Sequence, residues 1–149
     1  MRIDRRRALG LIGAGAATSA CATPAPGEAV SFQHGVASGD PTTGGAVLWT
    51  RVSGPEPSTR HVWIAYEVSE DDSFGSLVAR GRGTASAERD WTFKPDVSGL
   101  RPGRTYFYRF VCGEVASPVG RFRTLPLAQS TEEVVLAVAS CSLHPGGYF

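Results

Sequence analysis

The stretch that decides the fold is "LRPGRTYFY", residues 100–108. A Leu-x-Pro turn is followed directly by Tyr-x-Tyr, at the start of a segment with strand composition. Similar short segments recur on both sides, separated by turns rich in Gly and Pro. The expected strands lie within residues 31–38, 46–52, 61–69, 76–86, 89–100, 104–112 and 118–126. About seven strands with turns every 8–12 residues predict an all-β sandwich, here over residues 30–124.

Alternating side chains predict which strand faces are buried. Within residues 61–69 the pattern places Val62, Ile64, Tyr66 and Val68 on one face. Within residues 46–52 it places Val47, Trp49 and Arg51 together, and Trp49 is expected to be the central core aromatic. The segment 76–86 has a weaker pattern, so we expect it to form a pair of strands at a sheet edge.

The turn at residues 100–108 resembles the E–F corner of fibronectin type III domains. This resemblance implies a fibronectin type III/Ig-like β-sandwich, with Leu100 and Pro102 shaping the corner. It also implies that the Tyr106 hydroxyl bonds back to nearby backbone and fixes the crossover between sheets.

Composition and charge exclude several classes of function. The 149 residues are 42% hydrophobic and 19% charged, with a formal net charge of +1, which indicates a globular chain. Since phosphate backbones need a concentrated basic surface, we expect no nucleic-acid-binding module. We interpret the arginines scattered over the strands as a solvated outer face rather than a phosphate-binding patch. These are Arg51, Arg80, Arg82, Arg104, Arg109, Arg121 and Arg123.

Residues 1–29 have the layout of an export signal followed by a linker. A basic start precedes an apolar run at residues 8–17 and then small residues. The run is too short to span a bilayer, which needs roughly 20 apolar residues, so we expect no transmembrane helix in the mature chain. Arg5 and Arg6 resemble the pair of a twin-arginine signal, which predicts the twin-arginine export machinery as a partner. An ordinary secretory signal is the alternative. Either signal predicts a periplasmic or extracellular location.

The three cysteines leave alternatives open. Cys21 fits either lipidation at a lipoprotein box, which would anchor the protein to a membrane, or release by cleavage after small residues. Cys112 and Cys141 could pair in an oxidising compartment, or one could be a buried thiol and the other a ligand.

The C-terminal stretch predicts the start of a second domain. After an expected linker at residues 125–133, the continuous apolar run 134–139 suits a strand buried on both faces, as in a layered α/β sheet. Residues 134–149 are therefore interpreted as the truncated start of an α/β domain. Cys141 follows this strand at the position where α/β sheets hold ligands. From the sequence pattern alone it is a buried thiol, and with His144 it forms only half of a zinc motif, so His144 is not assigned.

The string "FQHGVASGDPTTGGAVLWTRV", residues 32–52, resembles the opening of alkaline phosphatase D (PhoD-like) enzymes. The runs 34–41 and 48–51 carry the resemblance, and the corner and the exit strand also fit. In this family a small fibronectin/Ig-like N-terminal domain precedes a metallophosphatase domain. The resemblance implies a phosphoric ester hydrolase that cleaves phosphomonoesters or phosphodiesters.

The resemblance also implies a mixed iron–calcium centre in the full-length enzyme, with Cys141 as an iron ligand. A thiolate suits ferric iron, whereas calcium takes oxygen ligands. After Cys141 the sequence has eight residues, without Asp, Glu or Asn. We therefore expect an N-terminal fragment that holds no catalytic residue, binds no metal stably and is inactive alone.

Parts of the sequence also suggest two other functions and one other site. A self-contained exported sandwich could bind a partner or a cell-wall polymer. A purple acid phosphatase with its own fibronectin-like domain is disfavoured by the residue 34–41 string. A catalytic triad of His34, Ser38 and Asp40 is rejected, because the three residues lie within one short loop. Local turns with an unusual dihedral at Gly39 are expected there instead.

Overall fold

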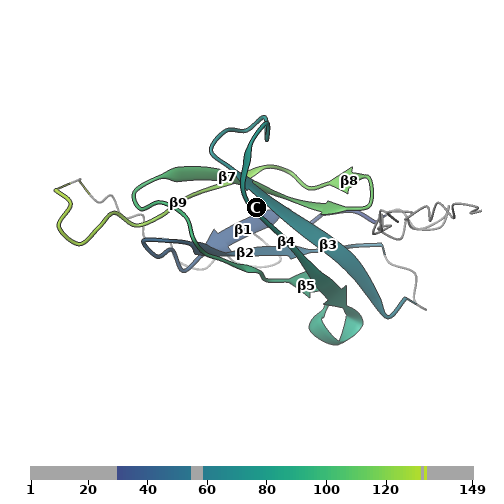
Figure 1. Cartoon of the computed structure of the whole chain (residues 1–149). Coiled ribbons are helices and arrows are strands. Elements are labelled where there is room, and N and C mark those ends of the chain that lie inside the picture. Colours follow the sequence, from purple (N-terminus) through teal and green to yellow (C-terminus); the bar gives the residue numbers. More distant parts are fainter. Residues whose placement is uncertain (1–29, 55–58, 132, 134–149) are drawn as a thin grey trace, which may run out of the picture.

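The computed structural model describes residues 30–54, 59–131 and 133. In this part of the chain the strands form two antiparallel β-sheets (Figure 1). The strands of the first sheet are β1 (Val36–Gly39), β2 (Ala46–Arg51), β5 (Thr92–Phe93) and β6 (Asp96–Val97). The central strand is β2, which pairs with β1 along one edge and with both β5 and β6 along the other. The all-β sandwich predicted from the sequence is confirmed.

The second sheet has the order β4-β3-β7-β8, and β9 also pairs with β7. Its strands are β3 (His61–Ser69), β4 (Leu77–Ser86), β7 (Thr105–Cys112), β8 (Val115–Ala116) and β9 (Gly120–Arg123). A short 3₁₀ turn, η1 (Ala87–Arg89), leads from β4 toward β5 in the other sheet. The segment 76–86, expected to be a weak edge pair, is in fact a single ten-residue strand at the sheet edge.

The core lies between the facing sides of the two sheets. From β3, Ile64 and Val68 are fully buried, and Val62 and Tyr66 pack against the core, as the alternation predicts. From β7 the inward residues are Tyr106, Tyr108, Phe110 and Cys112. The Phe93 and Phe110 rings meet edge to face across the two sheets, with centroids 5.9 Å apart. Aromatic pairs in this geometry stabilise a small core beyond the area that they bury.

The expectation for Trp49 is wrong. Trp49 does share a face of β2 with Val47 and Arg51, but this face is only half-buried, and the fully buried residues are Leu48 and Thr50. Thr50 tolerates burial because its hydroxyl donates to the Gly35 carbonyl at 2.9 Å. Alternation groups residues by face, but it does not say which face of a short strand meets the core.

The chain leaves the sandwich through a fixed point at Leu125. The Leu125 N–H donates to the Thr42 carbonyl at 2.8 Å, and its carbonyl accepts from the Gly103 N–H at 3.0 Å. These bonds lie one residue past the expected domain end at residue 124. Several sequence expectations lie outside the described residues: the export signal with Arg5 and Arg6, Cys21, the strand 134–139, Cys141 and His144.

Candidate functional sites

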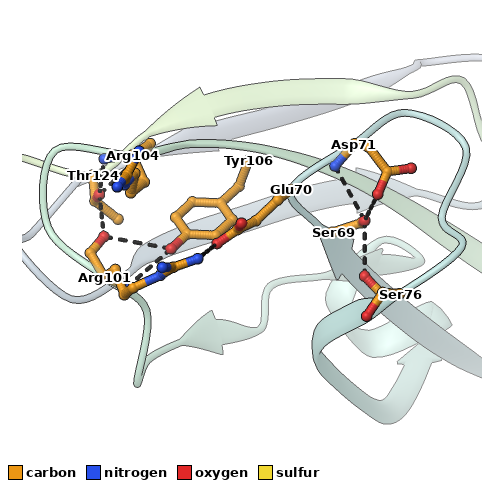
Figure 2. Close-up of polar contacts among 8 residues, drawn as sticks. All are labelled: Ser69, Glu70, Asp71, Ser76, Arg101, Arg104, Tyr106 and Thr124. Carbon is orange, nitrogen blue, oxygen red and sulfur yellow. Dashed lines mark hydrogen bonds and ion pairs between the residues drawn. The ribbon is translucent and has the colours of Figure 1, made fainter.

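The corner before β7 is built around Tyr106. Its side chain is 1% exposed, and its hydroxyl accepts a hydrogen bond from the Arg101 N–H at 3.0 Å (Figure 2). Leu100 is buried beside it and donates its N–H to the Gly44 carbonyl at 2.8 Å, whereas Pro102 is exposed. The tyrosine thus fixes the loop that carries the chain into β7, which is the geometry of a tyrosine corner.

Thr124 is a second anchor of the same loop. Its fully buried hydroxyl donates to the Arg101 carbonyl at 2.7 Å and accepts from the Arg104 N–H at 3.0 Å (Figure 2). Its own N–H donates to the Arg104 carbonyl at 3.0 Å. Sequence reasoning missed this residue, because a threonine at a strand end carries no signal of its partner some twenty residues away.

The Arg101 side chain connects the corner to the end of β3. Its guanidinium forms an ion pair with Glu70, just after β3, as Figure 2 shows. The neighbouring Ser69 is fully buried, and its hydroxyl bonds the Ser76 carbonyl at 2.9 Å and the Asp71 carboxylate at 3.2 Å. Hydrogen bonds from Ser73 are the main cause that lowers the pKa of Asp71. These contacts hold the β3–β4 loop at the corner end of the sandwich.

An exposed cluster forms where the first sheet meets η1. Arg51 donates to both carboxylate oxygens of Asp90, at 2.8 Å and 3.2 Å, and lies 2.6 Å from His34 Nε2. An arginine fork fits a carboxylate in this two-point geometry, and these hydrogen bonds hold the pKa of Asp90 below its usual range. If Arg51 donates to Nε2, neutral His34 carries its proton on Nδ1. The arrangement can order a surface loop, and its carboxylate and its imidazole Nε2 are both engaged by the Arg51 guanidinium.

The described residues show no contact that would make a triad of His34, Ser38 and Asp40. His34 Nε2 lies 2.6 Å from an Arg51 guanidinium nitrogen, and among the described residues no hydrogen bond joins His34, Ser38 and Asp40. The expectation of an unusual dihedral at Gly39 is wrong, because the left-handed residues of this stretch are Gly35 at φ +66° and Asp40 at φ +47°. Aspartate tolerates this region because its short side chain can bond locally.

Within residues 30–54, 59–131 and 133 there is no group of three or more His, Cys, Asp or Glu that could hold a metal ion. Cys112 is buried at the end of β7, where burial raises the pKa of its thiol. Cys141, with which Cys112 could form a disulfide, lies outside this part of the chain. The same residues contain no helix that is long and apolar enough to cross a membrane.

Comparisons with known proteins agree on one family. The family model of the PhoD-like phosphatase N-terminal domain matches residues 16–126. Alkaline phosphatase D of Bacillus subtilis (strain 168) is 35% identical over 125 residues, covering 79% of this chain and 21% of that protein. A solved structure of PhoD superposes with a TM-score of 0.62 and 37% identity over 64% of this chain and 19% of that chain. This chain therefore spans about a fifth of the length of the relatives that it matches.

A more distant likeness concerns the fold alone. The sensor domain of the anti-sigma factor RsgI4 from Pseudobacteroides cellulosolvens superposes with a TM-score of 0.50 and 18% identity. The match covers 62% of this chain and 93% of that domain. At this identity the likeness extends to the sandwich and not to an activity.

Proposed function

Because the chain belongs to the family of PhoD-like phosphatase N-terminal domains, we propose that it forms the N-terminal part of an exported, metal-dependent phosphoric ester hydrolase. The observation that carries this proposal is its 35% identity with an alkaline phosphatase D over 79% of the chain. The substrate class is a phosphate monoester or diester. Hydrolysis belongs to the full-length protein, and the 149 residues alone are inactive.

In this proposal the described sandwich positions the following domain and supplies no catalytic group. Its carboxylates at the two candidate sites are engaged by arginines, as in the pairs Arg51–Asp90 and Arg101–Glu70. Leu125 is bonded both to the loop before β2 and to the loop before β7. A segment that follows Leu125 therefore starts from a fixed point relative to both sheets, which favours a role in placing the next domain.

Iron and calcium are proposed for the full-length enzyme only. The described residues do not fit such a centre, since their potential ligands do not converge. The proposed iron ligand, Cys141, lies outside them.

Hydrolysis is tested on two proteins, the 149-residue chain and the product of any reading frame that continues beyond Phe149. With iron and calcium added, the chain is expected to leave p-nitrophenyl phosphate and bis(p-nitrophenyl) phosphate intact, and the longer product to hydrolyse at least one of them. Metal-dependent hydrolysis by the chain alone would contradict the assignment of catalysis to later residues. A stop codon followed by an unrelated gene would favour a self-contained binding module.

Export is tested by fusing residues 1–29 to a reporter that must fold before it crosses the membrane. The double variant Arg5→Lys/Arg6→Lys is expected to abolish export, because the arginine pair is the recognised feature. The matched control Arg2→Lys/Arg7→Lys keeps the charge and leaves the pair intact, so export should continue. Export through the general secretory route in the double variant would point to an ordinary signal.

A Cys21→Ser variant that moves from membrane to soluble fraction would identify lipidation.

A further inference from the structure

A hollow lies on one side of the sandwich, between the edge strand β4 and the short strand β5. It has a volume of about 580 Å³ and is lined by Gly83, Thr84, Arg89, Thr92, Phe93 and Lys94. The Phe93 ring covers Gly83 so closely that a β-carbon at position 83 would lie 2.5 Å from it. The absence of a side chain at Gly83 thus lets an aromatic ring form part of the lining.

Two cationic side chains, Arg89 and Lys94, line this hollow. Arg89 and Lys94 are exposed, and neither takes part in the ion pairs of the described residues. Two carboxylates flank Arg89 in sequence: Asp90 is already held by Arg51 on both oxygens, and Glu88 is exposed and does not line the hollow. Among the residues that line the hollow there is no acidic side chain. The hollow therefore carries two positive charges that can attract an anion.

Hydroxyl groups and fixed backbone add to these charges. The Thr92 hydroxyl donates to the Arg89 carbonyl at 2.7 Å, which holds the backbone of Arg89 against the start of β5. The Thr84 hydroxyl has no hydrogen-bond partner in the described part of the chain, so it can donate to a ligand. Arginine, lysine and hydroxyl donors together match the oxygens of a phosphate group.

An exposed aromatic side chain lies next to Thr84, one of the residues that line the hollow. Trp63 of β3 is directly paired with Thr84 of β4 and is 54% exposed. The Arg82 guanidinium lies over its ring, 5.3 Å from the centroid. Directly opposed residues on one sheet face are close neighbours, so the indole can contact an organic group attached to an anion in the hollow.

We propose that this hollow binds the phosphate group of an organic phosphate ester through Arg89, Lys94 and Thr84, with Trp63 contacting the organic part. The hollow would hold a phosphate-bearing ligand on the N-terminal domain without cleaving it. Because the hollow opens to water, binding depends on ionic strength.

The test uses phenylphosphonate, whose P–C bond a phosphatase does not hydrolyse, and inorganic phosphate. Each is titrated into the ¹⁵N-labelled 149-residue chain at constant ionic strength, and amide shifts are followed by NMR. Saturating shifts are expected at Gly83, Thr84 and Lys94. Failure of the proposed hydrolysis would leave this result unchanged, since no turnover is measured.

Two variants and a control make the result specific. Arg89→Gln/Lys94→Gln should weaken binding of both anions at least tenfold, whereas Arg104→Gln/Arg121→Gln removes the same charge from exposed positions near β9 and should weaken it less than twofold. Trp63→Ala should weaken phenylphosphonate binding more than phosphate binding. All substitutions are exposed, and unchanged dispersion of the other amides verifies the fold. Non-saturating shifts, equal losses in both double variants, or equal effects of Trp63→Ala on the two anions would overturn the proposal.

Discussion

Tyr108 of β7 and Gly120 of β9 are directly paired, and the Tyr108 ring covers the glycine. A β-carbon at position 120 would lie 2.3 Å from the Tyr108 Cζ atom. Tyr108 is 2% exposed and packs near the Phe122 ring, with centroids 5.8 Å apart, so the tyrosine has little room to move. The close approach of strand β9 to the core therefore depends on a residue without a side chain.

Gly120→Ala is expected to destabilise the domain. Overpacking of a filled site costs about 1–3 kcal/mol, because side chains or backbone must shift. Urea unfolding followed by fluorescence measures the loss as a lower midpoint with an unchanged slope. The matched control is Gly39→Ala in β1, where an added β-carbon meets nothing within 4 Å. Equal losses in both variants would show that backbone freedom, rather than the Tyr108 contact, sets the cost.

Tyr106→Phe is expected to lower the free energy of unfolding by about 1–3 kcal/mol, because the Arg101 N–H loses its acceptor. Tyr66→Phe removes the same hydroxyl from a half-buried tyrosine that makes no hydrogen bond in the described part of the chain. It should change stability by less than about 0.5 kcal/mol. Chemical denaturation of both variants provides the comparison. A Tyr106→Phe variant as stable as the parent would remove the corner's proposed role in stability.

The two anchors of Arg101 are expected to be coupled. Tyr106 binds its N–H and Thr124 its carbonyl, so the two side chains hold the same residue. In a double-mutant cycle of Tyr106→Phe and Thr124→Val, the interaction free energy should be about 0.5–3 kcal/mol. Losses that simply add would mean that each anchor acts on a separate part of the loop.

Asp90 should titrate below the ordinary carboxyl pKa of 3.8, because Arg51 donates hydrogen bonds to its ionised form. A pKa that is lowered in the folded state contributes stability above the unfolded pKa, and this contribution is lost as pH falls through the folded pKa. NMR titration of the Asp90 carboxyl carbon measures the shift. Arg51→Gln should raise the pKa toward its ordinary value, whereas the control Arg121→Gln should leave it unchanged. An Asp90 pKa that is insensitive to Arg51 would contradict the ion pair.

Cys112 is expected to react slowly with thiol reagents in the folded protein. It is 6% exposed, and burial raises the pKa of its thiol, which lowers the thiolate fraction. In a Cys21→Ser/Cys141→Ser variant, labelling should be slow in buffer and fast in urea. Fast labelling without denaturant would contradict the burial. Mass spectrometry of the parent chain separates the two open alternatives for Cys112, since a disulfide with Cys141 would lower the mass by two hydrogen atoms.

Local patterns predicted much of this fold, and their failures have physical causes. Alternation identified the buried face of β3, because one side of this strand faces the core and the other faces solvent. It misjudged Trp49, since a short strand with mixed residues does not reveal which face is covered. The segment 89–100 divides into β5 and β6 around Pro95, whose carbonyl accepts from Leu48. Proline has no N–H to continue the pairing.

The corner shows the limit of sequence reasoning more sharply. The Leu-x-Pro and Tyr-x-Tyr pattern directed attention to Tyr106, because its partner Arg101 lies only five residues away. Thr124 and Glu70 reach the same loop from distant parts of the chain. The hollow beside β4 is also formed by segments that meet only after folding. Such contacts follow from topology, which a single sequence does not specify.

The attachment of Leu125 has a mechanical consequence. Thr42 belongs to the loop between β1 and β2, and Gly103 to the loop that leads into β7, so a pull on the chain after Leu125 would load both sheets at once. Such a force would not separate β9 from β7 one hydrogen bond at a time. A force applied beyond Leu125 would therefore be shared between the two sheets from the start.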